Sequence, residues 1–298
     1  MAADNLASPE VALAAVYRRL QARIAELLRL ATAQQRVGRA LSPAFLSGQL
    51  QQISQALASV DAATNEWIGT QIPSQYRLSA GAADATLREA GMGFNVGFTG
   101  LDRRAVRALQ ERVADNLSHV REALTEGLAL GDPREATGRL AQVIAGDSSL
   151  VTFVGDVLRV ATPSGRLWDV EGYSRMLGRT AIADSRRVAF RQRYLANGID
   201  VVTVVANGSD HPACQVWEGR NLSLTGVTPG LPTVADARAA GLFHPNCRHR
   251  YVVATDVEQP GLLEEAGEVA AAEPALPILG RAPGATELPA PRVPRSTL

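Results

Sequence analysis

The residues best suited to chemistry are thiols and imidazoles gathered between positions 211 and 249. Thiolate sulfur and imidazole nitrogen are the ligands that a tetrahedral zinc ion prefers, and two short ligand pairs joined by a long loop can enclose one. Both cysteines of the chain and three of its four histidines lie there, as His211-Pro212-Ala213-Cys214 and His244-Pro245-Asn246-Cys247-Arg248-His249. The pattern predicts a loop pinned by a metal ion.

The spacing within each pair selects the ligands. Two residues separate His211 from Cys214, so a tight turn can aim both side chains at one point. Cys247 and His249 are one residue apart and share a face of an extended strand. Two residues separate His244 from Cys247, and His244 is the alternate ligand. Four ligands from this set predict a closed, structural zinc site, which would contribute on the order of 10 kcal/mol to folding.

Three alternatives compete with a structural zinc site. The cysteines could be buried thiols with the histidines on loops, or Cys214 and Cys247 could form a disulfide, which a reducing cytosol disfavours. With only three ligands the ion could activate water, with Glu218 or Asp210 as general base. The chain contains neither H-E-x-x-H nor H-x-E with P-C-x-x-C, so catalysis is not expected. Both acids are better explained as turn residues or as partners that orient a ligand imidazole.

Arginine is the second chemical feature. All 30 basic residues are arginine and the formal net charge is zero, so no overall field attracts nucleic acid or an anionic membrane. The segment 171–196 is nevertheless locally basic, and its arginines are candidate contacts to DNA or to a protein partner. These are Arg175, Arg179, Arg186, Arg187, Arg191 and Arg193. Asp184 falls on the packed side of this segment, where a carboxylate needs a partner such as one of these arginines.

The elements that must position the cysteines and histidines are short strands and helices. Pro163-Ser164-Gly165 lies between β-prone runs at 157–161 and 166–168, which predicts a hairpin. Asp169 caps a helix over 171–196 that Asn197-Gly198 ends. Beyond it we predict strands at 199–205, 222–224 and 250–254, and a helix from Thr233 to Ala240 with Asp236 in its capping box.

The first half of the chain is predicted to be helical. Ser8-Pro9 and Ser42-Pro43 are helix starts followed by apolar stripes, and further helices follow Asp102 and Asp132-Pro133. Periodicity fades from Gln71 to Asn95, which predicts a loose connection or an adaptable interface segment. The fold class is therefore α+β: a helical arm or bundle over 1–149, a compact α+β module over 150–256 with the zinc-pinned loop, and a disordered Pro- and Ala-rich tail over 257–298. Neither a secretory signal nor a membrane span is expected.

Several of these segments carry a resemblance. The strings Tyr173-Ser174-Arg175-Met176-Leu177-Gly178-Arg179-Thr180, Asn197-Gly198-Ile199, Pro212-Ala213-Cys214-Gln215-Val216-Trp217-Glu218-Gly219 and Pro245-Asn246-Cys247-Arg248-His249 resemble the phage minor capsid protein 2 family. More distantly they resemble the phage Mu F-like head morphogenesis proteins. The resemblance covers about 150–256.

The resemblance also bears on the metal ligands. The minor capsid family usually has P-S-H-x-x-W-x-G, so Cys214 stands where histidine is typical, and the Mu F-like proteins tend to show C-P-x-C there. Exchange between histidine and cysteine is what metal ligation tolerates. Ala181 departs from the acid or amide that often follows the Arg-Thr pair, which puts a polar role there in doubt.

The resemblance implies a structural role rather than turnover of a substrate. It implies a low-copy head protein near the portal vertex that acts in head assembly or DNA packaging, with portal and capsid proteins as partners and packaged double-stranded DNA as a further one. The expected location is the virion, at the capsid interior or portal vertex, and the host cytoplasm during assembly. No membrane partner is expected. The alternative is a zinc-dependent hydrolase or toxin-like enzyme carried in the phage head.

Overall fold

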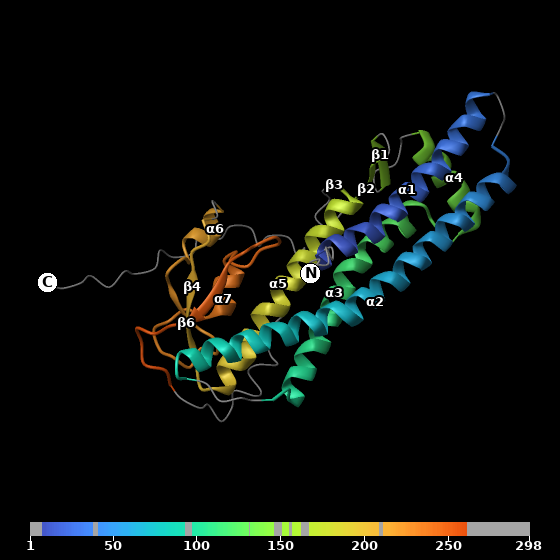
Figure 1. Ribbon diagram of the computed structural model, residues 1–298. Helices are drawn as coiled ribbons and strands as arrows, with labels where there is room; N and C mark the ends of the chain where they lie inside the picture. Colours follow the sequence, from blue (N-terminus) through green and yellow to red (C-terminus); the bar gives the residue numbers. More distant parts are fainter. Residues whose placement is uncertain are drawn as a thin grey trace, which may run out of the picture.

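A computed structural model describes residues 8–37, 41–92, 97–130, 132–145, 151–154, 157–161, 167–208 and 211–260 (Figure 1). Its long helices lie along one another, and a small sheet with its loops lies at one end of them. The elements in chain order are α1 (Pro9–Arg36), α2 (Pro43–Glu89), α3 (Gly100–Gly127), α4 (Pro133–Ala145), β1 (Val151–Val154), β2 (Val157–Ala161), β3 (Leu167–Asp169), α5 (Val170–Ala196), β4 (Val201–Val205), α6 (Pro212–Gln215), β5 (Asn221–Ser223), α7 (Val234–Ala239) and β6 (Arg250–Val253).

This order confirms the predicted fold class, a helical first half followed by a mixed region with small antiparallel sheets. Two predicted helix starts are also confirmed. Asp169 accepts a hydrogen bond from Gly172 N at the start of α5, and Thr233 forms a capping box with Asp236 at the start of α7. None of the helices in the described part of the chain is long and apolar enough to cross a membrane.

The prediction of a loose connection was wrong for residues 71–89, while residues 93–95 of the same segment lie outside the described residues. Most of this segment is the second half of α2, a continuous helix of 47 residues. Its buried stripe keeps the helical period, but small residues occupy it: Ala80 and Ala83 follow Tyr76. Alanine at these positions lets α2 lie against α5, and it weakens the hydrophobic contrast on which periodicity depends.

Helix α5 lies at the centre of the molecule. It packs against α1, α2 and α3, and its first turns lie in a large hydrophobic cluster that contains residues of all five long helices and of the hairpin strands. Its last turn, with Phe190 and Tyr194, belongs to a second cluster that continues into β4, β5 and β6. Because α2 also contributes to both clusters, two long helices connect the bundle to the second sheet.

Gly178 sets how closely α1 and α5 approach. A Cβ atom there would lie 3.1 Å from Leu13 Cδ2 and 3.2 Å from the backbone Cα of Glu10. We expect Gly178→Val to lower the free energy of unfolding by about 1–3 kcal/mol, because the added atoms push the two helices apart. Denaturant titration measures this change.

Gly48 in α2 provides the matched control. A Cβ there meets no atom within 4 Å, so Gly48→Val should change stability by less than about 1 kcal/mol. Equal losses in the two variants would show that the approach of α1 to α5 is not the cause.

The described residues form two antiparallel three-stranded sheets, with the strand orders β1-β2-β3 and β5-β4-β6. The predicted hairpin is present as the β2–β3 pair, in register through Val160 and Trp168, while its turn at 163–165 lies outside the described residues. Strand β1 was not predicted. In the second sheet Val202 pairs with both Leu222 and Val253, so β4 is central and its neighbours carry the loops of the cysteines and histidines.

Two polar side chains close the second sheet. The buried Asp200 carboxylate accepts hydrogen bonds from the hydroxyls of Ser223, Thr225 and Thr228, which fix the turn after β5. Gln259 bonds the main chain of β4 at Val201. The described chain therefore continues past residue 256, and the rest of the predicted tail, from 261, lies outside the described residues.

Candidate metal centre

Two loops of the second sheet bring the cysteines together. Strand β4 leads toward α6, where His211 is the N-cap residue, Pro212 begins the helix and Cys214 is completely buried. The second loop follows α7 and carries Cys247 and His249 just before β6. The predicted convergence of both pairs is therefore present in the structure.

Unusual backbone shapes this convergence. Gly241 has φ +103°, and a Cβ there would lie 2.9 Å from Ala213 Cβ, so only glycine lets the second loop pass against α6. Asn246 also has a positive φ, of 66°, and its N–H donates to Thr180 Oγ1 of α5 at 3.2 Å. The second loop is thus held on one side by α6 and on the other by α5.

Cys214, Cys247 and His249 form a buried cluster that could hold a metal ion. The two Sγ atoms are 3.7 Å apart, and Cys247 Sγ lies 3.3 Å from His249 Nδ1. Zinc–sulfur bonds of about 2.3 Å at tetrahedral angles place two sulfurs about 3.8 Å apart, and a sulfur and a nitrogen about 3.6 Å apart. Both cysteines are free thiols in the structure, so the alternative of a disulfide between Cys214 and Cys247 is not what the structure shows.

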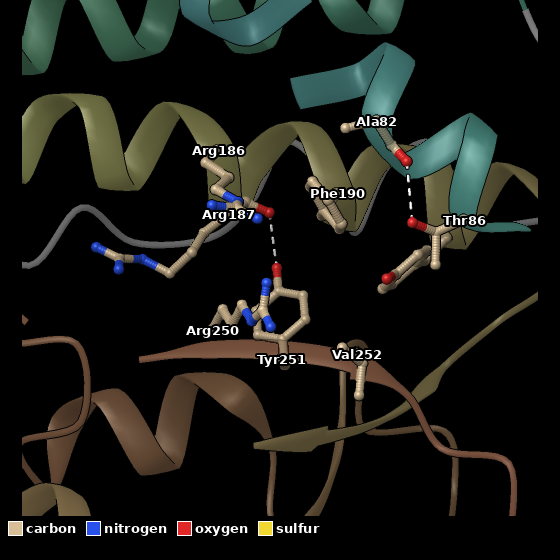
Figure 2. A pocket seen from close by; sticks show the side chains of 9 residues that line it. Ala82, Thr86, Arg186, Arg187, Phe190, Arg250, Tyr251 and Val252 are labelled. Carbon is tan, nitrogen blue, oxygen red and sulfur yellow. Dashed lines mark hydrogen bonds between the residues drawn. The ribbon is translucent and has the colours of Figure 1, made fainter. Parts of the chain in front are cut away.

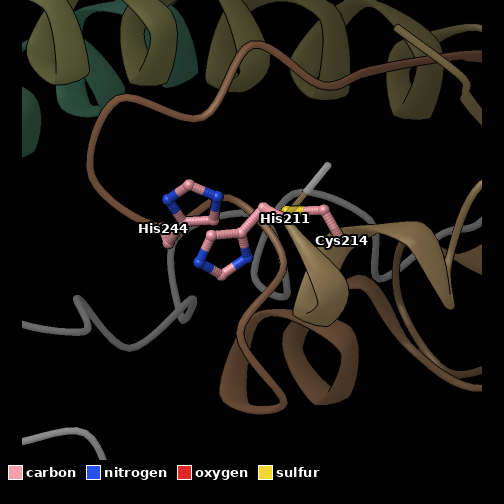
Figure 3. A group of neighbouring side chains, drawn as sticks. All are labelled: His211, Cys214 and His244. Atoms are coloured by element: carbon pink, nitrogen blue, oxygen red, sulfur yellow. The ribbon is translucent and has the colours of Figure 1, made fainter. Parts of the chain in front are cut away.

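A second group shares Cys214 and adds the other two histidines. His211, Cys214 and His244 also have their ligand atoms within 4.8 Å of one another. Figure 3 shows the two imidazole rings lying face to face beside Cys214, and their centroids are 3.9 Å apart. His211 is exposed, whereas His244 is half-buried. The five candidate ligands therefore form two groups of three that share Cys214.

The two ring nitrogens of His244 have different surroundings. His244 Nδ1 lies 2.7 Å from the carbonyl oxygen of Pro245, an arrangement in which Nδ1 carries the proton and donates it. Its Nε2 is buried and has no hydrogen-bond partner in the described part of the chain. Burial lowers the pKa of His244 and outweighs the Pro245 carbonyl contact, which raises it. This ring is therefore neutral at pH 7. A neutral imidazole with an open Nε2 is a metal ligand by its chemistry.

Glu218 contacts the His249 ring on the side away from Cys247. Its Oε1 lies 2.6 Å from His249 Nε2, while Nδ1 of the same ring faces Cys247. The hydrogen bond from His249 lowers the pKa of Glu218, so the carboxylate is ionised. The expectation that an acid orients a ligand imidazole is met by Glu218. Asp210 lies outside the described residues.

The thiols have a clear electrostatic requirement. Burial raises the pKa of Cys214 to about 12, and the neighbouring Cys247 sulfur adds to the increase. Two adjacent thiolates in this interior therefore need a cation to form, because each desolvated negative charge repels the other. A divalent ion supplies that charge and deprotonates coordinating thiols outright.

Some arginines of the predicted basic segment in α5 are buried and others lie at the surface. Arg187, Arg191 and Arg193 are in the interior, with side chains that serve the fold: Arg187 pairs with Asp184 at 2.6 Å, Arg191 donates to Leu224 O, and Arg193 donates to Gly97 O. These three are therefore not surface contacts. Arg175 pairs with Glu171, which leaves Arg179 and Arg186 from the predicted set at the surface.

Asp184 has the arginine partner that the sequence predicted, and a second one that it did not. Its Oδ1 lies 2.6 Å from Arg187 and 2.8 Å from Arg238 of α7, and all three side chains are largely buried. Burial alone would raise the pKa of the Asp184 carboxyl, but the charges of the two arginines lower it below its ordinary value. Arg238 was missed because no local spacing relates α7 to α5.

Comparison with known proteins bears on the region that holds the cluster. Residues 149–265 match the family model of phage minor capsid protein 2, which confirms the resemblance. The matched region begins just before β1 and contains both cysteines and all three nearby histidines. Searches among curated proteins and among solved structures returned no match.

Proposed function

We propose that this chain, whose residues 149–265 match the family model of phage minor capsid protein 2, is a structural part of a tailed-phage head or phage-like particle. It acts near the portal, in head assembly and DNA packaging, with portal and capsid proteins as its partners. The family match carries this proposal. The helical bundle is joined to the second sheet and its loops by α2 and α5, which contribute to both hydrophobic clusters. Such a connection also suits a component that holds other proteins in fixed positions.

The composition of assembled particles tests this role. In purified particles the chain should be present at far lower abundance than the coat protein, and particles assembled without it should contain less DNA. Quantitative mass spectrometry and DNA content measure the two effects. Absence of the chain from particles, or abundance equal to that of the coat protein, would contradict the proposal.

We further propose that the cluster binds one structural zinc ion. The donor set fits the ion, because two thiolates and imidazole nitrogens are its preferred ligands and the measured separations are close to tetrahedral edges. Cys214, Cys247 and His249 supply three ligands. We propose His244 rather than His211 as the fourth ligand, since His244 is in the group that shares Cys214, its Nδ1 contacts a carbonyl and its buried Nε2 has no hydrogen-bond partner among the described residues.

Paired histidine variants decide the fourth ligand. His244→Gln should weaken zinc affinity by at least about tenfold, because it removes a direct ligand, while His211→Gln should have a smaller effect. Competition with a chelator measures both. A larger loss in His211→Gln would assign the fourth position to His211 instead.

Glu218→Gln is expected to reduce zinc affinity by about 10–100-fold while the fold is kept, because the His249 ring loses the carboxylate that orients it. Metal competition gives the affinity, and circular dichroism checks the fold. Glu111→Gln, in α3 and outside the cluster, is the control. Unchanged affinity in Glu218→Gln would show that His249 is held without Glu218.

We propose that this centre is not catalytic. Of the two general-base candidates, Glu218 is the one among the described residues. Its carboxylate accepts a hydrogen bond from the main-chain N–H of Asn207 and faces His249. Its position behind a ligand ring suits orientation of that ring rather than deprotonation of a metal-bound water. Four protein ligands would also leave no open position for a substrate.

A further inference from the structure

We propose that a groove beside the cluster binds the phosphodiester backbone of duplex DNA. The anion groove, as we call it, is formed by α2, α5 and the segment from Cys247 to Arg250, and four arginines line it: Arg179, Arg186, Arg248 and Arg250. The inference deepens the proposed packaging role and rests on it for the choice of DNA as the anion. Its chemistry rests on the arginines alone.

The groove consists of two adjoining cavities. The larger has a volume of about 490 Å³ and the smaller about 300 Å³, and they share Ala82 of α2, Phe190 of α5 and Arg250 of β6. Figure 2 shows the smaller cavity, where Arg186 lies beside α5 and Arg250 lies beside β6, while α2 contributes Ala82 and Thr86. The shared residues make a continuous depression along α5.

Strand geometry explains why two of the arginines point to this side. Residues 247–250 alternate between the interior and the surface: Cys247 and His249 are buried, whereas Arg248 and Arg250 are exposed. Side chains of an extended segment alternate in this way. The ligands that hold the proposed ion therefore present the intervening arginines outward, next to Arg179 and Arg186 of α5.

These four guanidinium groups lack carboxylate partners in the described part of the chain. Arg179 donates weakly to the Asn246 side chain at 3.3 Å, and Arg186 lies over the Phe190 ring at 5.5 Å. Glu10 is the one acidic residue among those that line the larger cavity. A fifth arginine, Arg187, lies at the back of both cavities and is already paired with Asp184. The groove thus has a net positive charge in a chain whose total is zero.

The form of the groove favours phosphates over bases. Guanidinium forks match phosphate oxygens, and duplex DNA presents rows of them. A site for single strands needs exposed aromatic faces on which bases stack. Here Phe190 is 9% exposed and Tyr251 4%, and the Tyr251 hydroxyl donates to Arg187 O. The aromatic rings therefore form the floor of the groove and are not a stacking platform.

Binding of the full-length protein to a duplex oligonucleotide, measured over a range of salt concentrations, tests the proposal. Four phosphate contacts give a slope of log K against log salt of about −3.6. The double variant Arg248→Gln/Arg250→Gln should reduce this slope by about 2 and weaken binding at least about tenfold at low salt. Arg104→Gln/Arg107→Gln, exposed arginines of α3 outside both cavities, should leave the slope nearly unchanged.

Three results would overturn the proposal: no binding by the wild-type protein, equal losses in the two double variants, or equally tight binding of polyglutamate with the same arginine dependence. The last would assign the groove to an acidic protein segment. Zinc content and circular dichroism are recorded for every variant, so loss of the ion is separated from loss of the groove. Because particle composition is measured independently, a head protein that does not bind DNA here is also recognised.

Discussion

Cys247→Ser is expected to remove the metal ion and to unfold the sheet module, which we define as residues 199–208 and 211–260. We expect about one zinc ion per wild-type chain and none in the variant, because serine cannot replace a thiolate on zinc. Metal binding and folding are coupled, so the loss approaches the order of 10 kcal/mol that such ions contribute to small domains. The second hydrophobic cluster includes both cysteines and has no long helix of its own beyond the ends of α2 and α5.

Elemental analysis and circular dichroism measure these two effects. The first cluster contains no residue of the sheet module, so the helical signal of the bundle should persist. His119→Gln is the matched control, since it removes the fourth histidine of the chain, which lies on α3 and pairs with Glu122 at the surface. Metal-free wild-type protein that is as stable as zinc-loaded protein would refute the zinc proposal.

Asp184→Asn is expected to lower the free energy of unfolding by about 3–5 kcal/mol, because it leaves two buried guanidinium groups without their shared counter-charge. The pair joins α5 to α7, so the loss should be accompanied by weaker packing of α7. Glu135→Gln is the control: its pair with Arg139 is exposed and should contribute less than about 1 kcal/mol. Similar small losses in both variants would show that Asp184 is not needed as a charge.

The pH dependence of the same group gives an independent measurement. The pKa of Asp184 is lower in the folded than in the unfolded protein, so its stabilisation is fully present above the unfolded value. It is lost as the pH falls through the folded value. Denaturant titrations from pH 7 into the acid range should show a loss of stability in the wild-type protein that is reduced in Asp184→Asn.

The sequence predicted the features that depend on short spacing. Asp169 and Thr233 are cap residues that act on nearby N–H groups. The two ligand pairs converge because the first follows β4 and the second precedes β6, which pairs with β4. The second half of α2 was missed because Ala80 and Ala83 carry little hydrophobic contrast. The proposed choice of His244 over His211 could not be made from spacing, since it depends on a carbonyl contact at Pro245.

The arginines show where prediction from one element ends. The composition of α5 indicated a basic face, but three of its arginines are buried, and two of these, Arg191 and Arg193, donate to main-chain carbonyls of distant segments, at Leu224 and Gly97. Two others lie near Arg248 and Arg250, which are more than sixty positions away along the chain. Tertiary packing, which no local pattern contains, decides which charges reach the surface.

The path of α5 through both hydrophobic clusters has a mechanical consequence. At about 1.5 Å per residue, its 27 residues span about 40 Å without a break, from the first cluster to the edge of the second. Tension applied to the sheet would pass along this strut, and along its neighbour α2, into the bundle. No flexible linker interrupts either helix. A force applied to the sheet would therefore be transmitted along the helices to the bundle.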